Sequence, residues 1–375
     1  MAGTRGCRPS AFQDCSSDLF RDSSHQKVSV FRVRVDGVST PQSIITRKTS
    51  SSVFLVLTIN DGGEGTVRDA LAELPDLSSA VGSRAPEAAL AAIVGIGSAA
   101  WDRLYSGPRP RSLRPFTELV GGKHTAPATP GDLLIHIKAD RMDLCYEVGQ
   151  RLTQRLGAAV TTVDEVHGFR YFDLRDLIGF VDGTENPVGQ DAVDAITVGD
   201  EDPDFAGGSY VVIQRYVTDF ADWEALSVED QEKAIGRTKL ENIEMADDVK
   251  PANSHIALNV ITDDDGNEID ILRDNMPYGD ISGSGEKGTF YIAYSSGPDV
   301  SEQMLRNMFI GEPEGNYDRL LDFTTAVTGG QFFVPTSDFL SDPPEAPDPA
   351  ELGATAADSE PAPRSDGSLG IGSLR

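Results

Sequence analysis

The sequence predicts an α+β protein built from a duplicated unit, in which antiparallel strands are backed by helices. Strand-like and helix-like segments alternate between residues 51 and 309, and their order repeats once. A strand followed directly by a helix occupies matching places in the two halves, at 132–157 and at 288–309. A chain of 375 residues is also long enough for two ordinary domains, each with its own core.

The first half contains three predicted strands, because continuous apolar runs or alternation are typical of strands and a three-to-four spacing is typical of helices. The strands cover 51–60, 132–139 and 159–172. The helices cover 66–81 and 140–157, the second with Asp140 as its N-cap and Gly157 at its end. The alanine-rich segment 88–97 is compatible with either type.

The second half repeats this order of elements. Strands are predicted at 207–217 and 288–296, and helices at 221–237 and 300–309. Residues 255–274 alternate around Asp265-Gly266, which indicates a hairpin.

The charge of the chain restricts its partners. Sixty acidic residues against 32 basic ones give a net charge of −28, and such a surface repels nucleic acid and anionic membranes. No apolar run reaches the roughly 18 residues of a membrane span, and the first 26 residues contain no apolar export signal. We therefore predict a cytoplasmic protein that binds neither nucleic acid nor membrane.

Histidine spacing argues against a locally built zinc site. The five histidines (His25, His124, His136, His167 and His255) form no HxxH or HExxH pattern and no cysteine–histidine cluster. A metal centre with one histidine ligand is still possible, and haem is the commonest cofactor of that kind. From residue type alone, each histidine is more often a structural residue than a ligand.

Two other stretches carry candidate chemistry. In GFVDGTENP (179–187) a single acid, Asp182, stands between glycines, as in a tight turn, a phosphate loop or a mount for a catalytic carboxylate. Arg273 and Asn275 are two residues apart on an extended segment and should point to the same side. That pair is either a structural clamp for a carboxylate or a site for developing negative charge. We expect NMPYGD (275–280) to break the strand just after it.

Four motifs together resemble the dye-decolorizing peroxidases, nearest to the bacterial B-type group: GFVDGTENP, KPANSHIALNV, ILRDNMPYG and NYDRLLDFTTAVTGGQFFVP. The resemblance covers about residues 41–340. It implies two ferredoxin-like units of the dimeric α+β barrel type, at 41–175 and 176–340, with haem b bound in the second. The flanking segments 1–40 and 341–365 are predicted to be disordered, and the native start could lie near Val35 or Val38.

The same resemblance implies a role for each matching residue. His255 corresponds to the proximal ligand of the haem iron, Asp182 to the distal aspartate and Arg273 to the distal arginine. Asn275 corresponds to a nearby distal amide. Asp318 in NYDRLLDF is a weaker candidate for the carboxylate that orients the proximal ring.

These assignments imply an oligomeric peroxidase that reduces hydrogen peroxide and oxidises dyes or other small one-electron donors. A free aspartic acid has a pKa of about 4, so an aspartate as the proton acceptor predicts peak dye oxidation below about pH 6. The alternative is a haem-binding or iron-releasing, deferrochelatase-like protein of the same fold, which would need no distal acid.

The final residues, DGSLGIGSLR (366–375), place Leu369, Ile371 and Leu374 among glycines and serines after an acidic, proline-rich linker. Three apolar residues in six positions predict a groove that buries them. The stretch resembles the C-terminal peptide by which such peroxidases enter encapsulin nanocompartments, which makes the encapsulin shell protein an expected partner.

Overall fold

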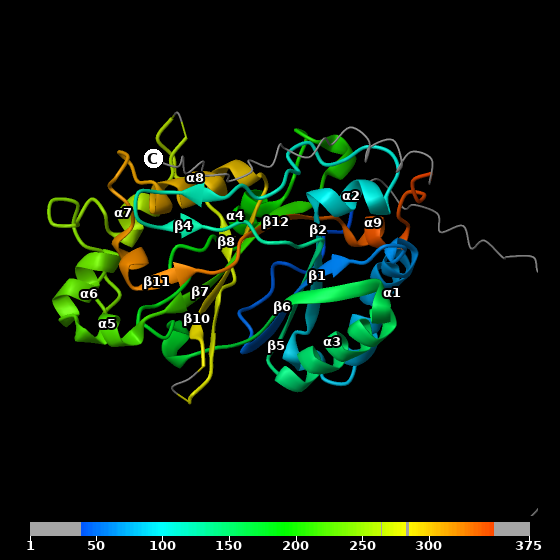
Figure 1. Cartoon of the computed structure of the whole chain (residues 1–375), viewed down its shortest axis with the longest axis horizontal. Helices are drawn as coiled ribbons and strands as arrows, with labels where there is room; N and C mark the ends of the chain where they lie inside the picture. Colours follow the sequence, from blue (N-terminus) through cyan, green and yellow to red (C-terminus); the bar gives the residue numbers. More distant parts are fainter. Residues whose placement is uncertain (1–38, 264, 283–284, 349–375) are drawn as a thin grey trace, which may run out of the picture. The chain divides into compact units, whose positions relative to one another are not determined.

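The computed structural model of the chain describes residues 39–263, 265–282 and 285–348 (Figure 1). The predicted leader up to residue 38, the linker from residue 349 onward and the docking residues Leu369, Ile371 and Leu374 lie outside these ranges. Within them, no helix has the length and apolar character to cross a membrane.

The first half of the described chain contains four long strands: β1 (Ser51–Ile59), β2 (Ala91–Gly97), β5 (Leu133–Ala139) and β6 (Val160–Phe169). They pair antiparallel in the order β6-β1-β5-β2. Helices α1 (Glu64–Gly82) and α3 (Met142–Leu156) lie side by side next to these strands (Figure 1). Their apolar faces and the alternate residues of β1 form one buried cluster, so this half is a βαββαβ unit.

The second half repeats the strand order. Its strands are β7 (Ser209–Thr218), β8 (Leu272–Arg273), β9 (Met276–Gly279), β10 (Lys287–Ser295) and β12 (Gly330–Val334), with helix α8 (Pro298–Phe309) after β10. The order is β12-β7-β10, and both β8 and β9 pair with β10. Each half thus has its fourth, first, third and second strands side by side, which confirms the predicted duplication of antiparallel α+β units.

The two halves share one continuous sheet, because β2 pairs with β12. The sheet is also strongly curved. Phe54 on β1 stacks on Phe290 on β10 with ring centroids 4.1 Å apart, although four strands separate β1 from β10 in the sheet order. The inner faces of both halves therefore meet in a common apolar core.

Shorter elements complete the description. They are α2 (Ser98–Leu104), β3 (Leu119–Val120), β4 (Thr125–Ala126), α4 (Gln190–Ile196), α5 (Phe220–Ala225), α6 (Val228–Ile235), α7 (His255–Asn259), β11 (Thr324–Ala326) and α9 (Ser337–Ser341). The segment 88–97, which the sequence left open, is strand from Ala91.

Two sequence-based predictions of local structure were wrong, and a third was confirmed only in part. The helix expected at 221–237 is two helices, since Ser227 caps α6 by accepting a hydrogen bond from the amide of Asp230. The expected N-cap Asp140 caps nothing, because α3 begins at Met142 and the carboxylate of Asp140 instead binds the amide of Ser50. The break expected after Arg273 is present but short, since β8 ends at Arg273 and β9 begins at Met276, inside NMPYGD.

The hairpin predicted for 255–274 is reduced to a single bridge between Thr262 and Glu268 around the Asp265-Gly266 turn. Its first residues form α7 instead, which His255 opens. Ser254 caps that helix through a hydrogen bond from the amide of Ala257 to its hydroxyl, 3.4 Å long. A capped helical turn satisfies its backbone N–H groups locally, whereas a strand needs a neighbouring strand to satisfy them. This local hydrogen bonding outweighed the apolar alternation that had predicted a strand.

Candidate active site

His255 is held by a buried carboxylate. Its Nδ1 lies 2.6 Å from Oδ2 of Asp318, whose side chain is 0% exposed, whereas the imidazole is 28% exposed. The other oxygen of Asp318 accepts the amide of Leu320 at 2.9 Å, so one carboxylate caps a helical turn and orients the ring. Because Nδ1 donates to Asp318, Nε2 carries the lone pair that can bind a metal ion.

The remaining described histidines have other surroundings. His124 and His167 pair with Asp322 and Glu165, which are both accessible to solvent. His136 is 0% exposed inside the common core. Groups of three or more metal-binding side chains do not occur in the described ranges, so His255 is the histidine best placed to act as a single axial ligand.

A second polar group is built around Asp182. Asn275 donates from Nδ2 to Oδ1 of Asp182 at 3.2 Å, and its Oδ1 accepts the amide of Ile292 on β10 at 2.9 Å. The second contact fixes the amide orientation, because a main-chain N–H can only donate. Asn275 therefore presents its NH₂ group to the carboxylate, and β10 sets the position of both.

Asn186, which sequence reasoning missed, holds the loop of Asp182 against the strand of Arg273. Its side chain donates to the carbonyl of Arg273 at 2.6 Å and accepts the amide of the same residue at 3.1 Å. The side-chain amide thus makes the two hydrogen bonds to the backbone of Arg273 that a neighbouring strand could make. The sequence signal that could have identified Asn186 is its position in the motif GTENP, four residues after Asp182.

The structure gives a specific reason for two glycines near Asp182. Gly183 has φ +72°, and a Cβ there would meet Nζ of Lys48 at 2.4 Å. The same ammonium group donates to the carbonyl of Asp182 at 3.1 Å. At Gly179, with φ +95°, a Cβ would meet the side chain of Lys239 at 2.6 Å. These glycines make room for two lysines and supply a left-handed backbone.

Arg273 carries an unsatisfied buried donor. Its Nε is buried and has no hydrogen-bond partner among the described residues. Buried polar groups are almost always paired in folded proteins, so an anionic or polar group that the protein alone does not provide would fit here. The carboxylates of haem, or a bound peroxide, are groups of that kind.

A narrow crevice reaches Asp182 from the surface. Its volume is about 20 Å³, and its walls include Lys48, Arg175, Asp182 and Asn275. That space holds roughly one water molecule, which suits a molecule as small as hydrogen peroxide. A larger hollow of about 460 Å³ lies between α1 and β2, lined by neutral residues such as Gln42 and Leu90, so it has no place in this chemistry.

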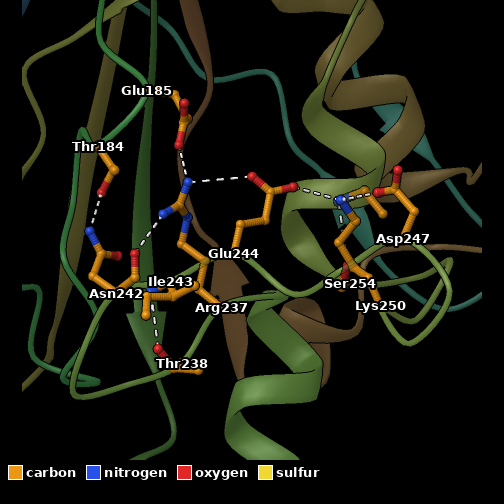
Figure 2. Close-up of polar contacts among 11 residues, drawn as sticks. Thr184, Glu185, Arg237, Thr238, Asn242, Ile243, Glu244, Asp247, Lys250 and Ser254 are labelled. Atoms are coloured by element: carbon orange, nitrogen blue, oxygen red, sulfur yellow. Dashed lines mark hydrogen bonds and ion pairs between the residues drawn. The ribbon is translucent and has the colours of Figure 1, made fainter.

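An ion-pair chain connects the loop of Asp182 with the segment that leads to His255 (Figure 2). Arg237 pairs with Glu185 and, at 3.5 Å, with Glu244. Glu244 in turn pairs with Lys250 at 2.6 Å, and Lys250 with Asp247 at 3.0 Å. The loop of Asp182 and the segment that precedes His255 therefore share one polar network.

Asp176 lies in the loop that presents Asp182. Its Oδ1 accepts the amides of Gly179 and Phe180 at 3.1 and 3.3 Å. Burial, together with the negative charge of Asp182, raises the pKa of Asp176 to about 7. The folded protein therefore binds a proton at this carboxyl that the unfolded chain releases nearer pH 3.8.

We expect Asp176→Asn to remove a pH dependence of stability. Because the pKa is raised in the folded state, the free energy of unfolding should fall as pH rises from 3.8 to about 7. Asparagine keeps an oxygen for the two amides but cannot ionise. Melting temperatures across this range should fall less steeply with pH in the variant than in the wild type. Asp173→Asn, which removes an exposed charge nearby, should leave the slope unchanged, and equal slopes for all three proteins would contradict the assignment.

The fold and these two polar groups define a peroxidase of the duplicated ferredoxin-like type. The chain belongs to the Dyp-type peroxidase family: residues 41–170 match its N-terminal domain and residues 173–339 its C-terminal domain. A dye-decolorizing peroxidase of Rhodococcus erythropolis is 61% identical over 335 residues, which cover 89% of this chain and 97% of the relative.

Solved structures show the same similarity. The encapsulated DyP-type peroxidase of Mycobacterium smegmatis, solved by cryo-EM, has 60% identity and a TM-score of 0.81, over 83% of this chain and all of that one. A DypB variant from Rhodococcus jostii RHA1 in complex with heme has 54% identity and a TM-score of 0.79, over 80% of this chain and 98% of that one. The predicted family, fold class and type of enzyme are confirmed.

Proposed function

We propose that this chain is a haem b-dependent peroxidase that reduces hydrogen peroxide and oxidises dyes or other small one-electron donors. The observation that carries the proposal is the 2.6 Å contact between Nδ1 of His255 and the buried Asp318. That contact would leave Nε2 free to hold the iron of a haem, while Asp182 and Arg273 would supply a carboxylate and a cation.

The residues present fit a haem. His255 would hold the iron through Nε2, and Arg273 would satisfy its buried Nε with an anionic oxygen. When bound, haem supplies the iron that binds peroxide and exchanges electrons with it. The heme complexes of the Rhodococcus jostii relative support this cofactor.

The chain itself would move one proton and stabilise charge. Asn275 orients Asp182 through Oδ1, so we assign the proton transfer to Oδ2. That oxygen takes the proton from the inner oxygen of hydrogen peroxide and returns it to the outer oxygen, which leaves as water. A positioned acid–base group of this kind contributes about 10²- to 10⁴-fold to the rate. The guanidinium of Arg273 stabilises the negative charge that develops as the O–O bond breaks.

A haem-handling or iron-releasing protein is the second candidate, and it would need His255 without the distal acid. The hydrogen bond between Asp182 and Asn275 favours the peroxidase, because an oriented carboxylate serves proton transfer and has no use in storage. Haem titration followed by dye bleaching separates the two functions. Stoichiometric haem binding with peroxide-dependent bleaching supports the peroxidase. Release of free iron from bound haem, without bleaching, would support the alternative.

We also propose that the enzyme is an oligomeric cargo of an encapsulin compartment in the cytoplasm. The encapsulated Mycobacterium smegmatis relative supports this, as does the tail with Leu369, Ile371 and Leu374. Residues 341–365 separate the proposed docking peptide from the folded part of the chain.

Removal of residues 366–375 is expected to abolish packaging and to leave peroxidase activity intact. The reason is that these residues follow the folded part and supply the only proposed contact with the shell. Co-expression with the shell protein and size-exclusion chromatography should show the truncated enzyme outside the capsid fraction. A matched variant with Leu369, Ile371 and Leu374 replaced by serine keeps the length and should behave like the truncation. Packaging of either variant at the wild-type level would defeat the proposal.

A further inference from the structure

A tyrosine and a histidine form a buried pair between the two halves of the fold. The hydroxyl of Tyr294 on β10 lies 2.9 Å from Nδ1 of His136 on β5, and both residues are 0% exposed. Phe54 stacks on the imidazole with ring centroids 4.7 Å apart. The reaction described above uses neither residue, and apolar side chains of the common core pack around them.

The hydrogen bond has a defined direction. Burial holds the pKa of His136 down at about 3, so the imidazole is neutral, and burial raises the pKa of Tyr294 well above its usual value. Nε2 of His136 has no partner in the described ranges. If Nδ1 carried the proton, both the Tyr294 hydroxyl and the bare Nε2 would be unsatisfied. If Nε2 carries the proton instead, only the Nε2–H group is unsatisfied. The tyrosine hydroxyl therefore donates to Nδ1.

Charged groups stand next to the pair. Nζ of Lys138 donates to Asp274 at 2.7 Å and to the carbonyl of Ile44 at 2.7 Å. Burial opposes the ionisation of Asp274, but the positive charge and the hydrogen bond of Lys138 outweigh it and lower the pKa of Asp274. Asp274 is thus an anion whose charge favours a proton on His136, while Lys138 weakens that effect.

The pair is one strand away from the peroxide site. Asp274 lies between Arg273 and Asn275 in the short gap between β8 and β9, and it lines the same crevice as Asp182 and Asn275. On the neighbouring strand, Tyr294 is opposite Leu272, and Ala293 is opposite Arg273. Ile292, two residues before Tyr294, donates the amide that fixes Asn275. Adjacent strands lie about 5 Å apart, so a short path through the backbone joins the pair to the site.

We propose that Tyr294 and His136 form a proton-coupled redox pair inside the enzyme. The proposal rests on the proposed function, because the peroxide-oxidised haem is the oxidant. Tyr294 gives one electron to that oxidant, and its phenolic proton moves to Nδ1 of His136. The products are a neutral phenoxyl radical, an imidazolium and a haem reduced by one electron. An electron from the external donor reverses both transfers and restores the pair.

Two other buried tyrosines, Tyr278 and Tyr216, donate to weaker proton acceptors. The hydroxyl of Tyr278 donates to the carbonyl of Tyr216 at 2.9 Å, and that of Tyr216 donates to the amide oxygen of Gln214 at 2.5 Å. Amide oxygens are far weaker bases than imidazole. A radical on either phenol would have to keep its proton or expel it into an apolar core, which burial opposes.

The test is electron paramagnetic resonance of the haem-loaded enzyme, frozen soon after one equivalent of hydrogen peroxide is added without a donor. We expect a tyrosyl signal in the wild type that Tyr294→Phe removes. His136→Gln should also remove it, since an amide cannot take the proton. Tyr278→Phe is the matched control and should keep the signal. In heavy water the signal should form more slowly, which a merely structural pair would not cause.

The outcomes separate the two proposals. A signal of wild-type size in Tyr294→Phe would overturn the redox pair and leave the peroxidase standing, provided that peroxide is still consumed. Failure of the wild type to react with peroxide would overturn both. If Tyr294→Phe does not fold, fluorotyrosine in place of tyrosine at this position should change the hyperfine splitting of the signal, and an unchanged spectrum would exclude Tyr294 as its source.

Discussion

Replacement of His255 with alanine is expected to abolish stable haem binding, because His255 is the proposed protein ligand of the iron. His255→Ala should leave the chain folded, since the ring is 28% exposed and contributes little to the core. The measurement is the ratio of Soret to protein absorbance after reconstitution with haem and gel filtration. His167 is an exposed histidine that also pairs with a carboxylate. The control variant His167→Ala should therefore bind haem like the wild type.

Asp318→Asn distinguishes the two roles of the Asp318 carboxylate, which contacts Nδ1 of His255 and accepts the amide of Leu320. An asparagine can still accept the amide of Leu320, but it no longer offers an anion to Nδ1 of His255. Loss of such a partner of a metal ligand costs about 10- to 100-fold in metal affinity, so the variant should bind haem more weakly but measurably. Full haem retention by His255→Ala with an unchanged spectrum would show that the axial ligand has been wrongly assigned.

The second large effect is expected on peroxide reduction. Asp182→Ala should lower kcat/KM for hydrogen peroxide by about 10²- to 10⁴-fold, the usual contribution of a positioned acid–base group. Arg273→Leu should lower it by about 10²- to 10³-fold, as for the loss of one preorganised donor to a developing charge. Both variants should still bind haem, because His255 is untouched. Stopped-flow mixing with peroxide measures this step without the donor.

The double variant gives a sharper criterion. Asp182 and Arg273 would act on the same bond-breaking step, so their combined effect should be smaller than the product of the single effects. Asp173→Asn, which alters an exposed acid in the same segment, serves as the control and should react at the wild-type rate. If Asp182→Ala alone reacted as fast as that control, the proton transfer would belong to another group, such as a water in the crevice.

Much of the fold was predictable because its elements have a regular period. The long strands and helices bury one face, so apolar spacing located them. The prediction failed where a single capping side chain decided the structure, as at Ser227 and Ser254. A five-residue helix such as α7 is too short to show a period, so the context of His255 could not be inferred from the alternation around it.

The site was predictable only in part, for a related reason. Asp182, His255 and Arg273 stand in short motifs whose residues are close in the sequence. Their partners are not: Asp318 is 63 positions from His255, and Asn186 is 87 positions from Arg273. No local pattern reports on contacts over such separations, which explains why Asn186 was missed and Asp318 was only a weaker candidate.

The sequence by itself determined the family and the duplicated α+β architecture, and it supplied the candidate residues of the proposed peroxide site, because periodicity and motifs are local properties of the chain. Only the tertiary structure decided which groups act together. Curvature of the sheet brings His136 of the first half to Tyr294 of the second, 158 positions away. The same folding places Asn275, which accepts the amide of Ile292 on β10, against Asp182, and it leaves Nε of Arg273 buried without a hydrogen-bond partner among the described residues. These contacts depend on the distance between atoms in the folded chain. That distance sets the strength of a hydrogen bond and decides whether a buried polar group has a partner.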